Sequence, residues 1–153
     1  MMNRWMEVAY NEATKGMLQR DGGPFGAVIV KDGEVIASAH NEVLCSKDPT
    51  AHAEVLAIRR ASQVLESFDL NGCTLYTTCK PCPMCLGAVL WARIPTVYYG
   101  TTEKDAAAIG FDDAKFYDVL MHKDNALVMQ QIDYEKTKEL FDNWVSDTKR
   151  ELY

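Results

Sequence analysis

Hydrophobic and polar positions change their period several times along this chain of 153 residues. From residue 3 to about residue 20, apolar side chains recur every three or four positions, which places them on one face of a helix. Asn3 can cap the start of this helix, and Gly22 and Gly23 follow its end. The chain is therefore predicted to begin with an amphipathic helix.

Two short apolar runs follow, at residues 25–30 and 34–39. The pair Asp32-Gly33 between them is typical of a two-residue turn, so we interpret this segment as a β-hairpin. The next residues, 41–47, are predicted to form a loop.

A second helix is predicted to start after Asp48, which can act as its cap, with Pro49 at its first position and an end near residue 65. Beyond it the pattern predicts a strand, a short helix and another strand, at residues 73–78, 83–93 and 96–100. Strands that alternate with helices imply right-handed crossovers and a layered α/β sheet.

The last part of the chain has a weaker pattern. Residues 101–117 indicate no more than a helical piece and a loop around residues 110–113. A fifth strand is expected near residues 126–131, and a terminal helix from residue 134 to about residue 150. Because the chain shows no repeats, low-complexity segments or linkers, one domain spanning residues 1–153 is expected.

The composition is typical of a globular protein, with 48% hydrophobic and 25% charged residues. The chain has no run of about 18 apolar residues that could span a bilayer, and its first residues lack the apolar core of a secretory signal. We therefore expect a cytoplasmic protein with no membrane partner. The net charge of −6 provides no long-range field that attracts nucleic acid, so a nucleic-acid partner is not expected.

Five cysteines lie between residues 45 and 85, an odd number in a short part of the chain. This distribution argues for metal ligation and reduced thiols rather than for a disulfide framework. Two of the cysteines belong to the run P-C-x-x-C at residues 81–85, which follows an H-x-E run at residues 52–54. Each run alone is common, but in this order they are the signature of zinc-dependent nucleobase deaminases.

On these two motifs the chain resembles the cytidine-deaminase superfamily. The resemblance implies an α/β fold of three layers, α/β/α, around a mixed sheet of five strands, with one zinc ion per subunit and a bound water. His52, Cys82 and Cys85 provide the three protein ligands that a catalytic zinc takes besides water. Glu54 matches the general acid/base that moves protons without binding the metal.

Other interpretations of these residues are open. His52 could be an ordinary core histidine, with Cys82 and Cys85 as small buried side chains. A purely structural zinc would need a fourth ligand, for which Cys79 is a candidate. Cys79 also fits the buried end of a strand, which we favour.

The spacing of His52 and Glu54 bears on where the metal lies. Residues two apart on a helix do not share a face, so both side chains reach one ion only if it lies beyond the N-terminal end of the helix, toward which side chains lean. Cys82 and Cys85 would approach from the start of the next helix. We therefore predict that zinc lies where the N-terminal ends of these two helices converge, and that their dipoles stabilise the thiolates.

Within the superfamily the chain is most similar to bacterial guanine deaminases. The matching segments cover nearly the whole chain: residues 22–28, 41, 48–54, 81–88, 110–113 and the aromatic Tyr153. The resemblance implies hydrolysis of guanine to xanthine and ammonia in purine metabolism. One departure is Lys80, because the residue at this place is commonly Glu in this branch.

The resemblance also implies roles in substrate binding. Phe25 would stack on the purine ring, and Asn41 offers the donor and acceptor that a base edge requires. Asp113 matches a second acidic group that accepts from the exocyclic amine or carries protons beside Glu54. The alternatives are a core side chain for Phe25, a turn residue for Asn41 and a solvated helix start for Asp112 and Asp113.

The C-terminal helix and tail, residues 134–153, are implied to close over the active site of a neighbouring subunit in a homodimer, with Tyr153 against the base. The alternative for Tyr153 is a frayed terminus, because terminal residues are often poorly ordered.

A tRNA adenosine deaminase is the nearest rival, because it shares the zinc motifs. Such an enzyme would carry a basic face on its C-terminal helix, whereas residues 134–153 contain four basic and five acidic residues. A deaminase of cytosine or another small base is also open, as is a zinc-stabilised scaffold that has lost activity. Glu54 argues against the scaffold, because a structural zinc needs no proton carrier.

Overall fold

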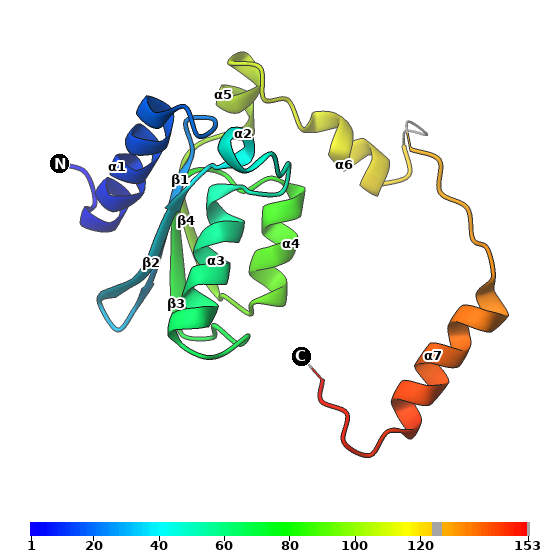
Figure 1. The fold of residues 1–153 in the computed structure, drawn as a ribbon. Helices are drawn as coiled ribbons and strands as arrows, with labels where there is room; N and C mark the ends of the chain where they lie inside the picture. Colours follow the sequence, from blue (N-terminus) through cyan, green and yellow to red (C-terminus); the bar gives the residue numbers. More distant parts are fainter. Residues whose placement is uncertain (124–126, 153) are drawn as a thin grey trace. The chain divides into compact units, whose positions relative to one another are not determined.

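A computed structural model of the chain describes residues 1–123 and 127–152. The chain divides into two compact units, Met1–Tyr117 and Asp118–Tyr153. The first unit contains a single mixed sheet of four strands in the order β2-β1-β3-β4 (Figure 1). The strands are β1 (Gly26–Lys31), β2 (Glu34–His40), β3 (Cys73–Cys79) and β4 (Thr96–Thr101).

The predicted hairpin is confirmed, because β1 pairs antiparallel with β2. On its other side β1 pairs antiparallel with β3, and β3 pairs parallel with β4. The parallel pair is joined through a helix, as such a connection requires.

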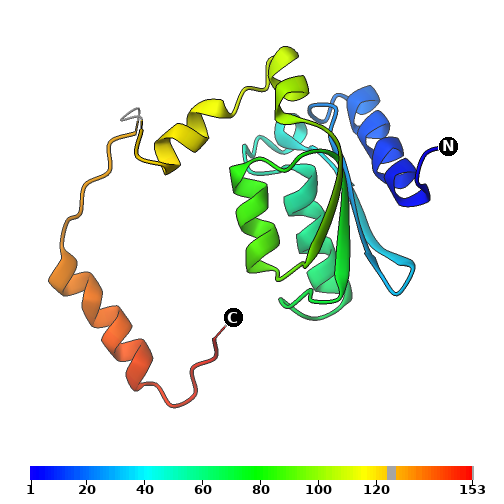
Figure 2. The ribbon, with the colours of Figure 1, turned by 180° about the vertical axis from the view of Figure 1, so that it is seen from behind.

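Three helices make the outer layers of the first unit (Figures 1 and 2). One face of the sheet is covered by α1 (Arg4–Gln19), and the other by α3 (Ala53–Val64) and α4 (Pro83–Trp91). The unit therefore has the expected α/β/α layers.

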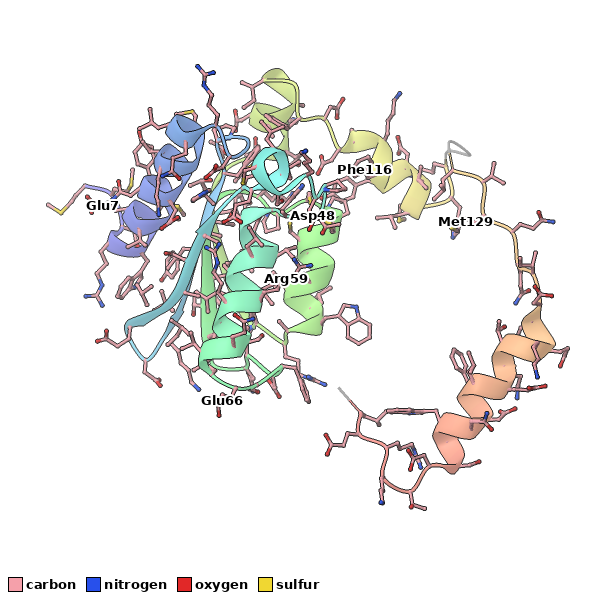
Figure 3. All side chains as sticks on the ribbon, in the orientation of Figure 1. Glu7, Asp48, Arg59, Glu66, Phe116 and Met129 are labelled. Atoms are coloured by element: carbon pink, nitrogen blue, oxygen red, sulfur yellow. The ribbon has the colours of Figure 1, made fainter. Side chains whose placement is uncertain are left out.

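The core lies on both faces of β1, whose side chains alternate between the layers. Ala27 and Ile29 pack with α3 and α4, whereas Val28 and Val30 pack against α1. On α3 the side chains that face the sheet are small and fully buried, so that the helix approaches the strands closely: Ala53, Ala57 and Ala61. Charged side chains such as Glu7 and Arg59 point away from this core (Figure 3).

The first helix has the predicted ends. The Asn3 side chain accepts hydrogen bonds from the backbone N–H groups of Trp5 and Met6, as an N-cap does. Arg20 adopts a left-handed conformation at the C-cap, with φ of 59°. The segment with Gly22 and Gly23 then leads into β1.

The loop expected at residues 41–47 contains a short helix, α2 (Val43–Ser46). The next helix starts later than predicted, because His52 and not Asp48 is its N-cap. Asp48 instead closes a turn, in which its Oδ1 accepts hydrogen bonds from the backbone N–H of Thr50 (2.8 Å) and from the hydroxyl of Thr50 (2.7 Å). An aspartate that satisfies a turn and one that caps a helix have the same local chemistry.

Two helices follow β4, α5 (Glu103–Ala108) and α6 (Ala114–Leu120), with residues 109–113 between them. The predicted fifth strand is wrong: the sheet has four strands, and residues 127–131 form none. Residue 126 lies outside the described part of the chain.

The second unit contains α7 (Tyr134–Ser146), which ends before the predicted residue 150. None of its residues is buried. Across the described ranges 1–123 and 127–152, no helix has the length and apolar character needed to cross a bilayer.

Candidate active site

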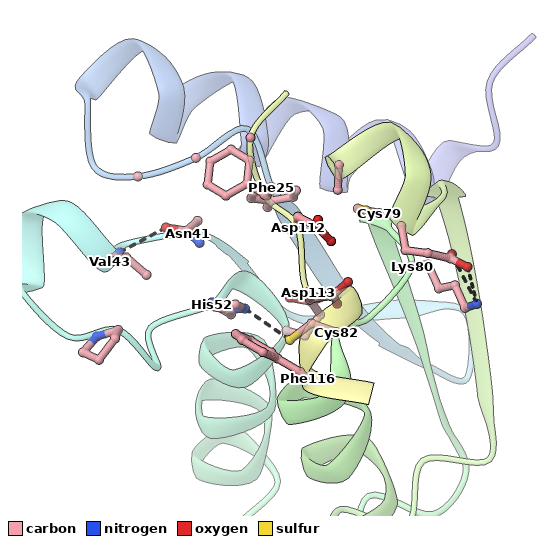
Figure 4. Close-up of a pocket in the computed structure, with 18 of the residues that line it drawn as sticks. Phe25, Asn41, Val43, His52, Cys79, Lys80, Cys82, Asp112, Asp113 and Phe116 are labelled. Carbon is pink, nitrogen blue, oxygen red and sulfur yellow. Dashed lines mark hydrogen bonds and ion pairs between the residues drawn. The ribbon is translucent and has the colours of Figure 1, made fainter. Parts of the chain in front are cut away.

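Two helix N-termini meet at the candidate metal site. His52 is the N-cap of α3, and Cys82 is the N-cap of α4. The Nδ1 atom of His52 lies 3.6 Å from the Sγ of Cys82 (Figure 4). It lies 3.5 Å from the Sγ of Cys85. The three candidate ligand atoms all lie within 4.8 Å of one another. The structure thus brings together the three residues predicted to bind zinc, at the two N-termini where the metal was expected.

The electrostatics of the cluster favour metal binding. The pKa of Cys82 is lowered to about 4, because Cys85 and His52 form hydrogen bonds with it, against the opposing effect of partial burial. Its position at the positive end of α4 also favours a thiolate. The hydrogen bond to Cys82 and burial raise the pKa of Cys85. One imidazole nitrogen and two sulfur atoms form a donor set that fits zinc and leaves a position for water.

Glu54 lies in the first turn of α3 and is only 6% exposed. Its Oε1 accepts a hydrogen bond from the Thr77 hydroxyl (3.3 Å), and its Oε2 accepts one from the Cys85 thiol (3.5 Å). Burial raises the pKa of Glu54. A buried carboxyl beside the metal donors is placed to hold and pass on a proton.

The spacing of His52 and Glu54 is resolved by the cap. His52 has an extended backbone, with φ of −72° and ψ of 152°, so the rule that helical residues two apart diverge does not apply to it. Only Glu54 is helical, and its side chain leans toward the N-terminal end of α3. The later start of the helix therefore explains how both side chains reach one place.

A cavity of about 600 Å³ opens beside these groups. One part of its wall is aromatic: the rings of Phe25 and Phe111 meet edge to face, with centroids 5.0 Å apart and planes at 83°, and Phe116 also lines the space (Figure 4). Phe25 packs against the main core as well, as its alternative interpretation expected, and stacking on a base stays a prediction. The volume is in the range of small-molecule sites.

Asn41 presents one half of its amide to the cavity. Its Oδ1 accepts a hydrogen bond from the backbone N–H of Val43 (3.1 Å), and its backbone N–H donates to the carbonyl of Phe25 (3.0 Å). Because the oxygen is engaged, the amide N–H groups are the donors offered to a ligand. Gly22 packs so closely that a Cβ there would lie 2.0 Å from this Oδ1.

The two aspartates after Phe111 differ in their roles. Asp112 Oδ1 accepts a hydrogen bond from the backbone N–H of Ala114 (2.9 Å), at the start of α6. Asp113 also lines the cavity, and its pKa is raised by partial burial and by the charge of Cys82. The helix-start interpretation therefore describes Asp112, whereas Asp113 lies near the metal donors.

Lys80 lies at the rim of the cavity, where it pairs with Glu103 at 3.3 Å. Cys79 ends β3 as a buried side chain, as predicted, and within the described part of the chain it is not in the metal-binding group. Tyr153, predicted to contact the substrate, lies outside the described residues.

Some residues of the site had not been predicted. Phe111 belongs to a motif that was noted only for its aspartates, and Phe116 follows it on α6. Thr77 was treated as an ordinary strand residue. Thr77 could have been noticed as a polar residue at a position of β3 where the alternation of inward and outward side chains predicts a buried residue.

A profile of the family described as cytidine and deoxycytidylate deaminase zinc-binding region matches residues 1–101. The guanine deaminase of Bacillus subtilis is 54% identical over 113 residues, which are 74% of this chain and 72% of that protein. The tRNA-specific adenosine deaminase of Aquifex aeolicus is 46% identical over 100 residues, 65% of this chain and 66% of that protein.

Solved structures agree with these relatives. The crystal structure of the Bacillus subtilis guanine deaminase superposes with a TM-score of 0.94 at 43% identity and covers 99% of both chains. A guanine deaminase from Nitrosomonas europaea superposes with a TM-score of 0.66 at 33% identity, over 71% of this chain and 63% of that one. The profile match over the first 101 residues and these likenesses show that the chain belongs to the zinc-dependent cytidine and deoxycytidylate deaminase family.

Proposed function

We propose that this protein is a zinc-dependent aminohydrolase that converts guanine and water into xanthine and ammonia. The observation that supports the proposal is the cavity, whose lining includes His52, Cys82 and the buried Glu54 together with Asn41 and several aromatic rings. The similarity to guanine deaminases over most of the chain supports the choice of base.

The cavity suits a flat, polar-edged base. The rings of Phe25 and Phe111 provide apolar contacts for a purine. The N–H groups of Asn41 donate to an acceptor on the base edge, such as the keto oxygen or a ring nitrogen of guanine. Adenine carries an amine where guanine carries its keto oxygen, so a donor at that edge would disfavour adenine.

Zinc held by His52, Cys82 and Cys85 would supply a water of lowered pKa, close to a hydroxide at neutral pH. Glu54 accepts a proton from the attacking water and delivers it to the ring nitrogen beside the carbon that carries the amine. It then takes the proton of the hydroxyl now bonded to that carbon and passes it to the amine, so that the C–N bond breaks, ammonia leaves and the keto group of xanthine forms. The raised pKa of Glu54 suits a group that must hold a proton between these steps.

Asp113 has a supporting role in this proposal. It lies on the cavity wall, and burial together with the charge of Cys82 raises its pKa. In this position it accepts a hydrogen bond from the exocyclic amine, or carries protons beside Glu54. Lys80 is held at the rim by Glu103 and takes no part in the chemistry.

We also propose a cytoplasmic homodimer in which residues 134–153, with Tyr153, close the active site of the neighbouring subunit. All five cysteines are free thiols, as a reducing compartment maintains them. On α7 four apolar side chains are exposed, which suits a helix that packs against a partner: Leu140, Phe141, Trp144 and Val145. β4 forms one edge of the sheet, because among the described residues it pairs with β3 and with no further strand.

The rival activity on tRNA receives little support from α7. Lys138 pairs with Asp142 at 2.8 Å, and Lys136 pairs with Glu139 on the same helix. These lysines are neutralised locally, so they form no basic stripe of the kind that binds an RNA backbone.

The test is ammonia release by the purified, zinc-loaded protein from guanine, adenine, cytosine, cytidine and a tRNA anticodon stem-loop. Guanine is the expected substrate. No release from guanine, together with release from any other compound, would contradict the proposal and identify the alternative.

A further inference from the structure

A buried histidine outside the zinc cluster bridges two carboxylates. His40, at the end of β2, is 6% exposed. Its Nδ1 lies 2.9 Å from Oε2 of Glu12 on α1, and its Nε2 lies 2.8 Å from Oδ2 of Asp21, just after α1. Ionised carboxylates only accept hydrogen bonds, so both ring nitrogens must donate.

We propose that His40, held as an imidazolium between Glu12 and Asp21, is a positioning residue for Asn41 in base binding. The proposal rests on the function given above, because it assigns the base contact to Asn41. His40 itself does not line the cavity. It acts through the chain segments on either side of the Asn41 amide.

The first of these segments is the loop that contains Asp21. The backbone carbonyl of Asp21 accepts hydrogen bonds from the N–H groups of Leu44 (2.9 Å) and Cys45 (3.1 Å), which belong to α2. Gly22 follows directly and packs against the Oδ1 of Asn41. The ion pair of Asp21 with His40 therefore fixes the wall behind the amide.

The second segment is the end of β2. His40 precedes Asn41, so the orientation of its backbone sets where the amide begins. When His40 is held to both carboxylates, this end of the strand is tied to α1 and to the loop after it. Asn41 is thus held from both sides, and its amide loses little freedom when a base binds.

The fit of the imidazole ring shows that its place is defined. It packs against Gly16 of α1 so closely that a Cβ there would lie 2.4 Å from Cδ2 and 2.6 Å from Cγ of His40. A second anchor is the Ser38 hydroxyl, which donates to Oε1 of Glu12 at 3.2 Å. The pKa of Glu12 is lowered by its bonds to His40 and Ser38 and by Lys15, despite the opposing effect of partial burial.

The two carboxylates provide matched variants for the test. Asp21→Asn removes the negative charge that faces the imidazole from the loop beside the cavity. Glu12→Gln removes the negative charge that faces the same imidazole from α1. In the zinc-loaded protein we expect Asp21→Asn to raise the KM for guanine roughly tenfold, as expected for a lost hydrogen bond to a charged group. Zinc content and kcat should stay near the wild-type values. Glu12→Gln keeps the contact of His40 with Asp21 next to Gly22, so it should raise the KM clearly less than Asp21→Asn at a comparable loss of Tm.

Equal changes in KM in both variants, in proportion to their loss of Tm, would show a merely structural role and overturn the proposal. A second readout needs no substrate: nitrogen NMR at neutral pH should show protons on both ring nitrogens of His40. A neutral ring with one bare nitrogen would overturn the proposal. The side-chain amide signals of Asn41 should shift more in Asp21→Asn than in Glu12→Gln.

These readouts separate the two ideas. If the wild-type protein releases no ammonia from guanine, the proposed function fails, while the NMR signals of His40 and Asn41 still decide the positioning role. If the wild type is active on guanine and the two variants behave alike, the positioning role fails and the function stands.

Discussion

Burial distinguishes Glu54 from the other carboxylates of the cavity. Its replacement by Gln keeps the size of the side chain and one of its two acceptor oxygens, but the amide cannot take up and release a proton as the carboxyl does. We expect turnover of guanine by Glu54→Gln to fall by about 10²–10⁴-fold, the usual contribution of general acid–base catalysis. Zinc content, measured by atomic absorption, should not change, because Glu54 is not a proposed ligand. The exposed Glu7→Gln variant is the control, and full activity in Glu54→Gln would rule out the mechanism.

A substitution at Gly22 tests the role of Asn41 without changing Asn41 itself. A methyl group at this position would meet the Oδ1 of Asn41 at 2.0 Å and push the amide away from the cavity. Gly22→Ala should therefore raise the KM for guanine by about tenfold, the cost of a misplaced hydrogen bond. The matched control is Gly87→Ala on α4, where a Cβ meets nothing within 4 Å. An unchanged KM in Gly22→Ala would remove Asn41 from the binding site.

The metal donors were predictable from the sequence because zinc chemistry restricts residue type. Only a few side chains bind zinc, and their spacing near a helix start is constrained, so His52 and Cys82 could be identified without a structure. Asp113 could not be separated from Asp112 in this way. Which carboxylate caps α6 and which faces the cavity is decided by the path of the loop, and two adjacent aspartates have the same local signal.

At the scale of the element, the predicted start of α3 at Asp48 was wrong because one local signal fits two structures. Asp48 and Pro49 are good signals for a helix start, and the same residues are good signals for a turn. The choice depends on tertiary contacts, such as the backbone hydrogen bond from Glu42 to the carbonyl of Ala51 at 3.0 Å, which ties the turn to the end of β2. Glu42 lies six positions before Asp48, outside the few residues that carry the signal for a helix start.

The contact of α3 with the sheet depends on small side chains. Ala57 is fully buried, with its neighbours one turn away on the same face also alanines. Ala57→Leu should overpack this layer and lower the free energy of unfolding by about 1–3 kcal/mol. Gln63→Leu places the same side chain on the exposed face of α3 and should change stability by less than about 0.5 kcal/mol. Urea denaturation of both variants makes the comparison, and equal stabilities would contradict the close packing of α3.

The absence of the predicted fifth strand shows that the periodicity of a sequence does not predict which strands pair. Residues 127–131 have strand-forming side chains, but a strand forms only beside a partner with free backbone groups. The local sequence indicates a preference for extended backbone, but it does not indicate which edge of the sheet such a segment would pair with. In the described residues β4 remains the edge of the sheet.

At the scale of the whole molecule, the single domain and the homodimer stay predictions. The residues of the cavity all belong to the unit Met1–Tyr117, so zinc binding and the proton carrier need no second subunit. Closure by the tail is a separate property. Deletion of residues 147–153 should lower the turnover of guanine while zinc content is kept, and sedimentation should show that the protein is a dimer. A monomer would exclude closure by a neighbour.

A mixture of two impaired variants decides whose active site the tail closes. One variant carries Glu54→Gln with an intact tail, and the other has Glu54 but lacks residues 147–153. If the tail closes the neighbouring site, a mixed dimer contains one site with Glu54 and with the tail of its partner, and turnover should rise above that of either variant alone. If each tail closes its own site, both sites of the mixed dimer lack one component. The mixture would then be no more active than its parts, and Tyr153 could act only on its own subunit.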